Sequence, residues 1–136
     1  MNNIPVTSAD GIAVNGVIHK IYAVTAPPTR VLLDTMARDA DLQYLVAAVL
    51  AADAGVPAGS RFQDYLANPL ANFTVMAPTN DAFNNLFAVL GVPKSPTSFA
   101  LLPAATVRGI VAYHVLLARA FAANLPTTAT PVPSLL

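Results

Sequence analysis

The sequence contains no cysteine and no glutamate. Without cysteine, this chain of 136 residues can form no disulfide, no zinc–thiolate site and no thiol nucleophile. All seven acidic residues are Asp, so the Glu side chains that often serve as general bases and metal ligands on helices are missing. These two absences exclude several common classes of catalytic and metal-binding site.

Charge of either sign is scarce. Charged residues make up 10% of the chain, and the seven Lys and Arg residues balance the seven Asp residues to a formal net charge of zero. Average soluble domains carry roughly 25% charged residues. A neutral chain lacks the electrostatic footprint that attracts nucleic acid or an anionic membrane surface, so we expect no nucleic-acid partner.

Long hydrophobic runs are missing too, although apolar residues make up 55% of the chain. The run Tyr44–Ala52 has nine residues, whereas a membrane-spanning helix needs about 20. A second apolar stretch, 109–123, is interrupted by His114 and Arg119, so we expect no transmembrane segment. The N-terminus has neither the basic nor the apolar region of a signal peptide. We expect a piece of a longer, exported protein whose signal lies upstream.

The first 25 residues favour strands. β-forming side chains recur over residues 12–24, and Asn15-Gly16 marks a turn or bulge between two strands. His19 lies in the second of these apolar runs. The following Ala26-Pro27-Pro28 predicts a stiff linker, because proline fixes φ and extends the residue before it.

From residue 29 onward the apolar residues recur with the period of a helix. We predict a short helix that begins at Thr29, and a second one capped by Asp39 or Asp41 and closed by Gly55. Residues 56–71 are predicted to be irregular, with one extra helical turn.

Residues 73–76 predict a short buried strand that ends at Pro78. Thr79 suits the N-cap of a third helix that ends at Gly91, and Asp81 in its first turn complements the helix dipole. The predicted apolar stripe of this helix is Phe83, Leu86, Phe87 and Leu90.

A Pro/Ser-rich loop is predicted over residues 93–98, and Pro103 suits the first turn of a fourth helix. The predicted inner face of this helix is Val107, Ile110 and Val111. Residues 113–116 then indicate an exit into a strand. The tail from residue 126 to 136 is rich in Pro, Thr and Ser.

Two segments resemble the signatures of fasciclin-like domains. The run 73–83, Phe-Thr-Val-Met-Ala-Pro-Thr-Asn-Asp-Ala-Phe, resembles the first signature, and 110–115, Ile-Val-Ala-Tyr-His-Val, resembles the second. Phe83 and Tyr113 are 30 residues apart, which fits the spacing of that family. The motif residues of the first signature are Thr74, Pro78, Thr79, Asn80, Asp81 and Phe83.

A third resemblance lies at an unexpected place. Residues 15–21, with Asn15, Gly16 and His19, look like the closing strand of a fasciclin-like domain, which comes last in that family. The resemblance therefore implies a tandem array, in which residues 1–26 finish one repeat and residues 27–136 form the next without its final strands.

Two arrangements of this strand stay open. It folds back onto its own chain, as in a circular permutant, or it completes a second copy and gives a swapped dimer. A lone hairpin is marginal in water, so we expect one of the two. Fold-back is slightly favoured, although three stiff linker residues span only about 9 Å.

The resemblance implies an α+β fold, with a small β-sandwich or wedge packed against several helices. Fasciclin-like domains occur on extracellular adhesion proteins and bacterial envelope lipoproteins, and they are generally binding modules without catalytic activity. We therefore expect an adhesion module whose partners are other proteins or matrix and envelope components, and no cofactor. The alternative is a carrier domain for an apolar small molecule or lipid.

Tyr113 and His114 are the candidate interaction residues. The region of this pair is implicated in integrin recognition in some animal members of the family. We favour a structural role, in which the Tyr113 ring is packed with its hydroxyl hydrogen-bonded and His114 bridges backbone groups at a helix exit.

The other candidate sites also have simpler structural explanations. His19 lacks the nearby ligands that a metal site needs. The segment 79–81 suits ordinary capping better than anion binding. The glycosylation sequon at 72–74 overlaps a predicted buried strand. No serine lies in a nucleophile-elbow pattern and no Gly-rich loop suits a phosphate, so we predict no catalytic residue, no metal ligand and no cofactor-binding residue.

Overall fold

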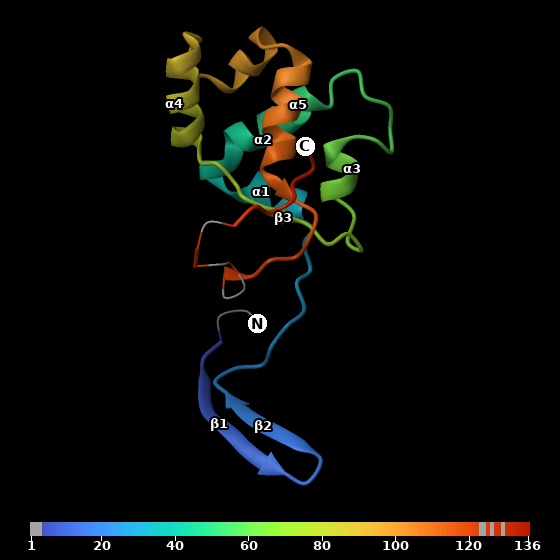
Figure 1. The fold of residues 1–136 in the computed structure, drawn as a ribbon, viewed down its shortest axis with the longest axis vertical. Helices are drawn as coiled ribbons and strands as arrows, with labels where there is room; N and C mark the ends of the chain where they lie inside the picture. The colour runs from blue at the N-terminus through green and yellow to red at the C-terminus, as the bar shows by residue number, and fades with distance from the viewer. Residues whose placement is uncertain (1–3, 123–124, 126, 129) are drawn as a thin grey trace.

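The structure is a computed structural model that describes residues 4–122, 125, 127–128 and 130–136. Its elements in chain order are β1 (Val6–Ala13), β2 (Gly16–Ile21), α1 (Leu32–Arg38), the 3₁₀ helix η1 (Ala40–Leu42), α2 (Gln43–Ala52), α3 (Phe62–Leu66), β3 (Thr74–Val75), α4 (Asn80–Leu90), the 3₁₀ helix η2 (Pro96–Leu101), α5 (Ala104–Tyr113) and β4 (Val115–Leu116) (Figure 1). The predicted α+β fold is confirmed. The strands form two separate two-stranded sheets, β1–β2 and β3–β4.

Helix α2 is the centre of a helical body. It packs against α5, η2, α1, α4 and α3, and its own Ala48 and Val49 are almost fully buried. The buried apolar core consists of Met36, Leu45, Ala48, Val49, Ala52, Phe62, Leu66, Phe83, Phe87, Phe99, Val107, Val111 and Ala112. Because these residues come from every helical element except η1, the whole segment from α1 to α5 folds around one core.

An aromatic cluster fills the side of this core between α4 and η2. The Phe87 ring centroid lies 5.0 Å from that of Phe99, and Phe83 meets Phe99 edge-on at 5.3 Å. Tyr44 contacts Phe87 at 6.0 Å. The predicted apolar stripe of α4 is therefore buried at Phe83 and Phe87, while Leu90 at its end is 44% exposed.

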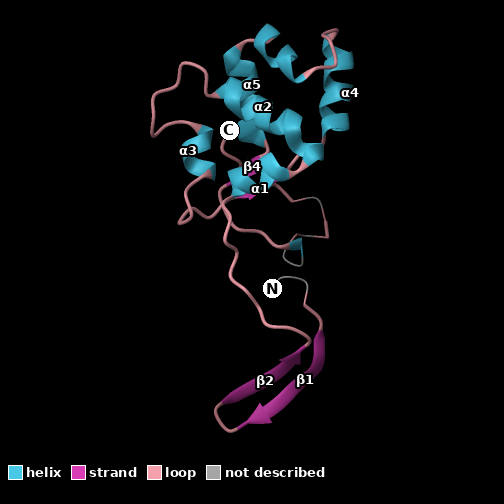
Figure 2. Ribbon diagram, turned by 180° about the vertical axis from the view of Figure 1, so that it is seen from behind, coloured by secondary structure: helices cyan, strands magenta, loops and turns pink. Residues whose placement is uncertain are grey.

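The small β3–β4 sheet lies at the base of the body, beside α1 (Figure 2). Thr74 pairs with Leu116, and the Met76 amide donates to the His114 carbonyl at 2.8 Å. On the other side of β4, Ser134 forms a bridge to Leu116. The predicted strand over residues 73–76 is thus shorter than expected and only partly buried.

Strands β1 and β2 form an antiparallel hairpin that stands apart from the body in both views (Figures 1 and 2). Ala13 pairs with Gly16 across a turn at residues 14–15, close to the predicted turn. In the described part of the chain the two strands pair only with each other. The fold-back arrangement favoured from the sequence is therefore wrong, because the linker at 22–31 carries the hairpin away from the β3–β4 sheet.

Two predicted boundaries also differ. The first helix begins at Leu32 rather than near Thr29, because it forms only where Leu32 and Leu33 reach the core. A loop was predicted over residues 93–98, but the 3₁₀ helix η2 begins at residue 96 and continues to residue 101. Ser95 caps η2 by accepting a hydrogen bond from the Thr97 amide at 3.3 Å, and Phe99 anchors it in the aromatic cluster.

Candidate functional site

His114 ends α5 and connects that helix to the small sheet. Its Nδ1 lies 2.8 Å from the Ile110 carbonyl oxygen, and its own carbonyl accepts the Met76 amide. The imidazole is half-buried. These contacts support the structural role proposed for His114, since one residue links the last turn of α5 to the chain that follows β3.

Tyr113 is placed differently. Its side chain is 67% exposed, and its ring meets the His114 ring edge-on at 6.1 Å. No described residue hydrogen-bonds to its hydroxyl. The prediction that this ring is packed is therefore wrong, because Tyr113 at the end of α5 is largely exposed. Beside it is a shallow recess of about 390 Å³, lined by Tyr113, Leu116, Thr130, Pro131, Val132 and Ser134.

The residues of the first signature hold the start of α4 in place. Thr79 is the N-cap, and its Oγ1 accepts a hydrogen bond from the Ala82 amide at 3.3 Å. The Asn80 side chain accepts from the Tyr44 amide at 2.9 Å and donates to the Ala40 carbonyl at 2.8 Å. Thus Asn80 joins α4 to the start of α2, and capping explains this polar cluster better than a bound anion does.

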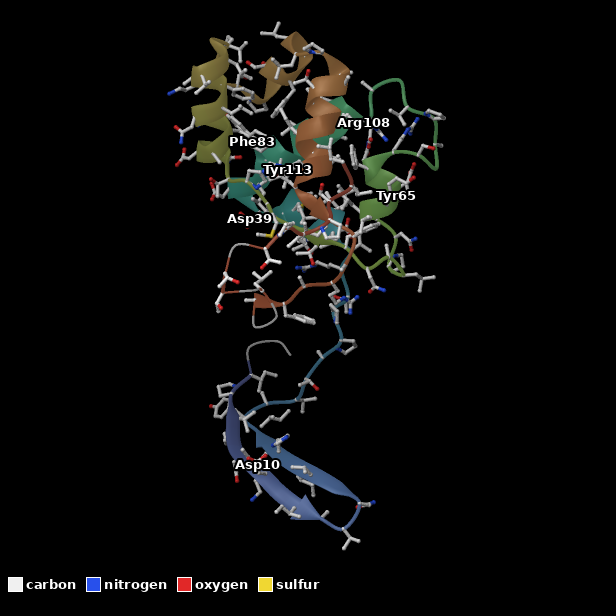
Figure 3. The ribbon with its side chains drawn as sticks, viewed as in Figure 1. Asp10, Asp39, Tyr65, Phe83, Arg108 and Tyr113 are labelled. Atoms are coloured by element: carbon white, nitrogen blue, oxygen red, sulfur yellow. The ribbon has the colours of Figure 1, made fainter. Side chains whose placement is uncertain are left out.

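The remaining motif residues are also engaged in the fold. The Thr74 hydroxyl donates to the Ala118 carbonyl and accepts from the Ala120 amide, both at 2.8 Å. Pro78 is half-buried and Asp81 is exposed in the first turn of α4. Phe83 belongs to the aromatic cluster and points into the body (Figure 3).

Replacing the cap tests this assignment. We expect Thr79→Ala to lower the free energy of unfolding by about 1 kcal/mol, because the Ala82 amide loses its acceptor. The matched control is Thr106→Ala, an exposed threonine inside α5. Urea titration of both variants measures the difference, and an unchanged midpoint for Thr79→Ala would contradict the capping role.

Sequence reasoning missed a buried carboxylate. Asp53 ends α2 and accepts hydrogen bonds from the amides of Phe62 at 2.7 Å and Gln63 at 3.0 Å. Arg108 of α5 lies 3.8 Å from the carboxylate and 4.7 Å above the Phe62 ring, and it donates to the Ser60 carbonyl. The one available signal was an Asp directly after an apolar helix end. Because these contacts join α2, α3 and α5, the cluster supports the fold and forms no open site.

A groove runs between the linker and the base of the body. It has a volume of about 800 Å³ and is lined by Thr25, Ala26, Pro27, Pro28, Thr29, Arg30, Val31, Leu32, Tyr65, Asn68, Pro69, Ala71, Phe73, Arg119 and Phe121. The rings of Tyr65 and Phe73 meet edge-on at 6.4 Å on one wall. Such a volume falls within the range of about 300–1,000 Å³ that is usual for small-molecule sites. Sequence reasoning had predicted no site here.

The hairpin carries an apolar face without a partner in the described chain. Cross-strand neighbours share a face of a sheet, so the pairs Ile12–Val17 and Val6–Ile21 lie on the same side. These side chains are 42% to 90% exposed. His19 shares their face by alternation, and its Nδ1 accepts the Asp10 amide at 3.2 Å. Asp10, far from the body, is labelled in Figure 3.

Among the described residues, no three His or Asp side chains gather closely enough to hold a metal ion. No helix in the described ranges is long and apolar enough to cross a membrane.

Comparison with known protein families decides the identity. The model of the fasciclin domain matches residues 54–136, more than half of the chain. The chain belongs to the fasciclin domain family. Both signatures identified from the sequence lie within the matched residues. Comparison with curated proteins finds no match.

Membership of this family carries a general function. Fasciclin domains are generally associated with adhesion or protein interaction, are typically non-catalytic, and are typically extracellular or attached to the cell surface. The chain exposes Tyr113 and a groove, and it also exposes an apolar hairpin face that lies outside the residues matched by the family model.

Proposed function

We propose that this fasciclin domain is a non-catalytic adhesion module of the cell exterior or envelope, which acts through protein–protein contacts made by its β1–β2 hairpin. The observation that carries the proposal is the unpartnered apolar face formed by Val6, Ile12, Val17 and Ile21. Exposed apolar side chains gathered on one face, here on both sides of His19, are typical of an interaction site.

The hairpin needs a partner for physical reasons. A two-stranded hairpin alone is marginal in water, and each buried aliphatic side chain contributes roughly 1.5–3 kcal/mol. Among the described residues, neither outer edge of the hairpin pairs with another strand. Exposed edges of this kind are templates for pairing with another strand.

A second copy of the chain is the partner we propose. In the body, β4 has β3 on one side and the bridge to Ser134 on the other, so among the described residues the outer edge of β3 has no strand partner. The hairpin of one copy can extend the sheet of the other, which gives a swapped dimer. Zero net charge favours this association, since it removes electrostatic repulsion between copies. The same exchange would join neighbouring domains if residues 1–26 belong to the sheet of a preceding repeat.

Single substitutions on the hairpin test the proposal. We expect the chain to self-associate in sedimentation velocity, and Val17→Lys to make it monomeric because a charge enters the apolar face. Asn15→Lys is the matched control, since it adds the same charge at the turn beside that face. We expect this variant to associate as the unsubstituted chain does. A chain that stays monomeric over a wide range of concentration, or equal association by both variants, would refute the hairpin contact.

A second candidate function is that of a carrier for an apolar small molecule or lipid. The groove favours it, because its walls include Tyr65, Phe73 and Phe121 and its volume suits a ligand of many carbon atoms. This function does not compete with adhesion, as the hairpin face and the groove use different residues.

A further inference from the structure

We infer that the groove binds an amphiphilic carboxylate of the fatty-acid class, held at its head by Arg30 and Arg119. The inference rests on the carrier function proposed above and specifies its ligand. Two of the seven Lys and Arg residues of this neutral chain line a single groove, and none of the lining residues is Asp.

The two guanidinium groups lack partners in the described chain. The structure gives Arg30 and Arg119 neither an ion pair nor a side-chain hydrogen bond among the described residues, and both are exposed. By contrast, Arg61 donates to the Val56 carbonyl and Arg108 lies beside Asp53. Arg30 and Arg119 therefore have donors available to a ligand, and among the described arginines Arg38, outside the groove lining, shares this property.

The chemistry of these groups suits an anionic head group such as a carboxylate. Arginine presents a planar fork of N–H donors that matches the two oxygens of a carboxylate, and such charge-assisted bonds are stronger than neutral ones. The groove that Arg30 and Arg119 line also has apolar walls. Tyr65 and Phe73 form an edge-on pair, and Phe121 is 61% exposed. A small inorganic anion would leave these walls uncovered, and a neutral lipid would gain no charge-assisted bond from either arginine.

Calorimetric titration of the full chain with monomeric laurate tests the inference. Methyl laurate serves as the probe with the same tail and no charge. We expect laurate to bind, and Arg30→Gln or Arg119→Gln to weaken its binding about tenfold each, through loss of a bond to a charged group. Arg38→Gln, at the last turn of α1 and outside the groove lining, is the matched control and should bind as the unsubstituted chain does.

The tail contacts need their own variant. Phe121 is exposed, so Phe121→Ser should leave the fold intact while it weakens laurate and methyl laurate alike. Methyl laurate should bind about tenfold more weakly than laurate to the unsubstituted chain and should be insensitive to Arg30→Gln. Absence of laurate binding, equal affinity for the two probes, or equal losses with Arg38→Gln would overturn the inference.

The Val17→Lys variant separates this inference from the adhesion proposal. Val17 lies on the hairpin, outside the groove lining, so the variant should still bind laurate. If the unsubstituted chain is monomeric and binds laurate, the hairpin contact is refuted and the carboxylate site is supported. If the unsubstituted chain self-associates and does not bind laurate, the hairpin contact is supported and the carboxylate site is refuted.

Discussion

Phe87→Ala is expected to lower the free energy of unfolding by about 3–5 kcal/mol. The side chain is fully buried and touches the rings of Tyr44, Phe83 and Phe99 at centroid distances of 5.0 to 6.4 Å. Truncation removes a large apolar surface and leaves a cavity, and the aromatic pairs add to the loss. Since domains are stable by only about 5–15 kcal/mol, this change removes a large part of the total.

Val89→Ala is the matched control for this prediction. Val89 lies on the same helix α4 and is 84% exposed, so its truncation should shift stability by less than about 0.5 kcal/mol. Urea titration should show a lower midpoint for Phe87→Ala with an unchanged slope. Equal midpoints for the two variants would show that the aromatic cluster is not the centre of the core.

Asp53→Ala is expected to cost about 3 kcal/mol of stability. The carboxylate is 2% exposed at its side chain and accepts two backbone amides and the Gln63 side-chain amide. Its removal leaves the buried Phe62 amide without an acceptor and Arg108 without its counter-charge. Each unsatisfied buried donor costs about 1–3 kcal/mol, while Arg108 is 40% exposed and recovers part of its loss from water.

Asp53→Asn should lower stability by an intermediate amount. One side-chain oxygen remains as an acceptor, while the new amide group faces donors rather than acceptors. Asp41→Ala, which removes an exposed carboxylate without a side-chain hydrogen bond in the described chain, is the control and should have little effect. Thermal unfolding of the three variants gives the order. If Asp53→Ala and Asp41→Ala unfolded at the same temperature, the buried cluster would be dispensable for the fold.

The helices could be predicted because their signals are local. Thr79 and Gly91 mark the two ends of α4, and the structure has a side-chain cap at the first and a left-handed residue at the second. Asp39 caps the segment before α2 as one of two predicted alternatives. The family signatures likewise lie within single short segments, so one chain was enough to identify them.

The features that could not be predicted depend on residues far apart in the sequence. Arg108 meets Asp53 across 55 positions, and the groove combines residues 25–32 with Arg119 and Phe121. No local period or cap indicates such contacts. The exposure of Tyr113 was missed for a related reason, since the direction of the last turn of α5 depends on how that helix sits on α2.

The central position of α2 sets where this domain can be divided and recombined. The family match begins at residue 54, yet Val107 and Val111 of α5 belong to the same core as Leu45 and Val49 of α2. A genetic crossover at residue 54 would bring together helix surfaces selected in different parents. A crossover within 22–31 would exchange the hairpin whole and leave every core contact within one parental sequence. The linker is therefore the joint at which a chimaera of two relatives would inherit a new hairpin with an intact body.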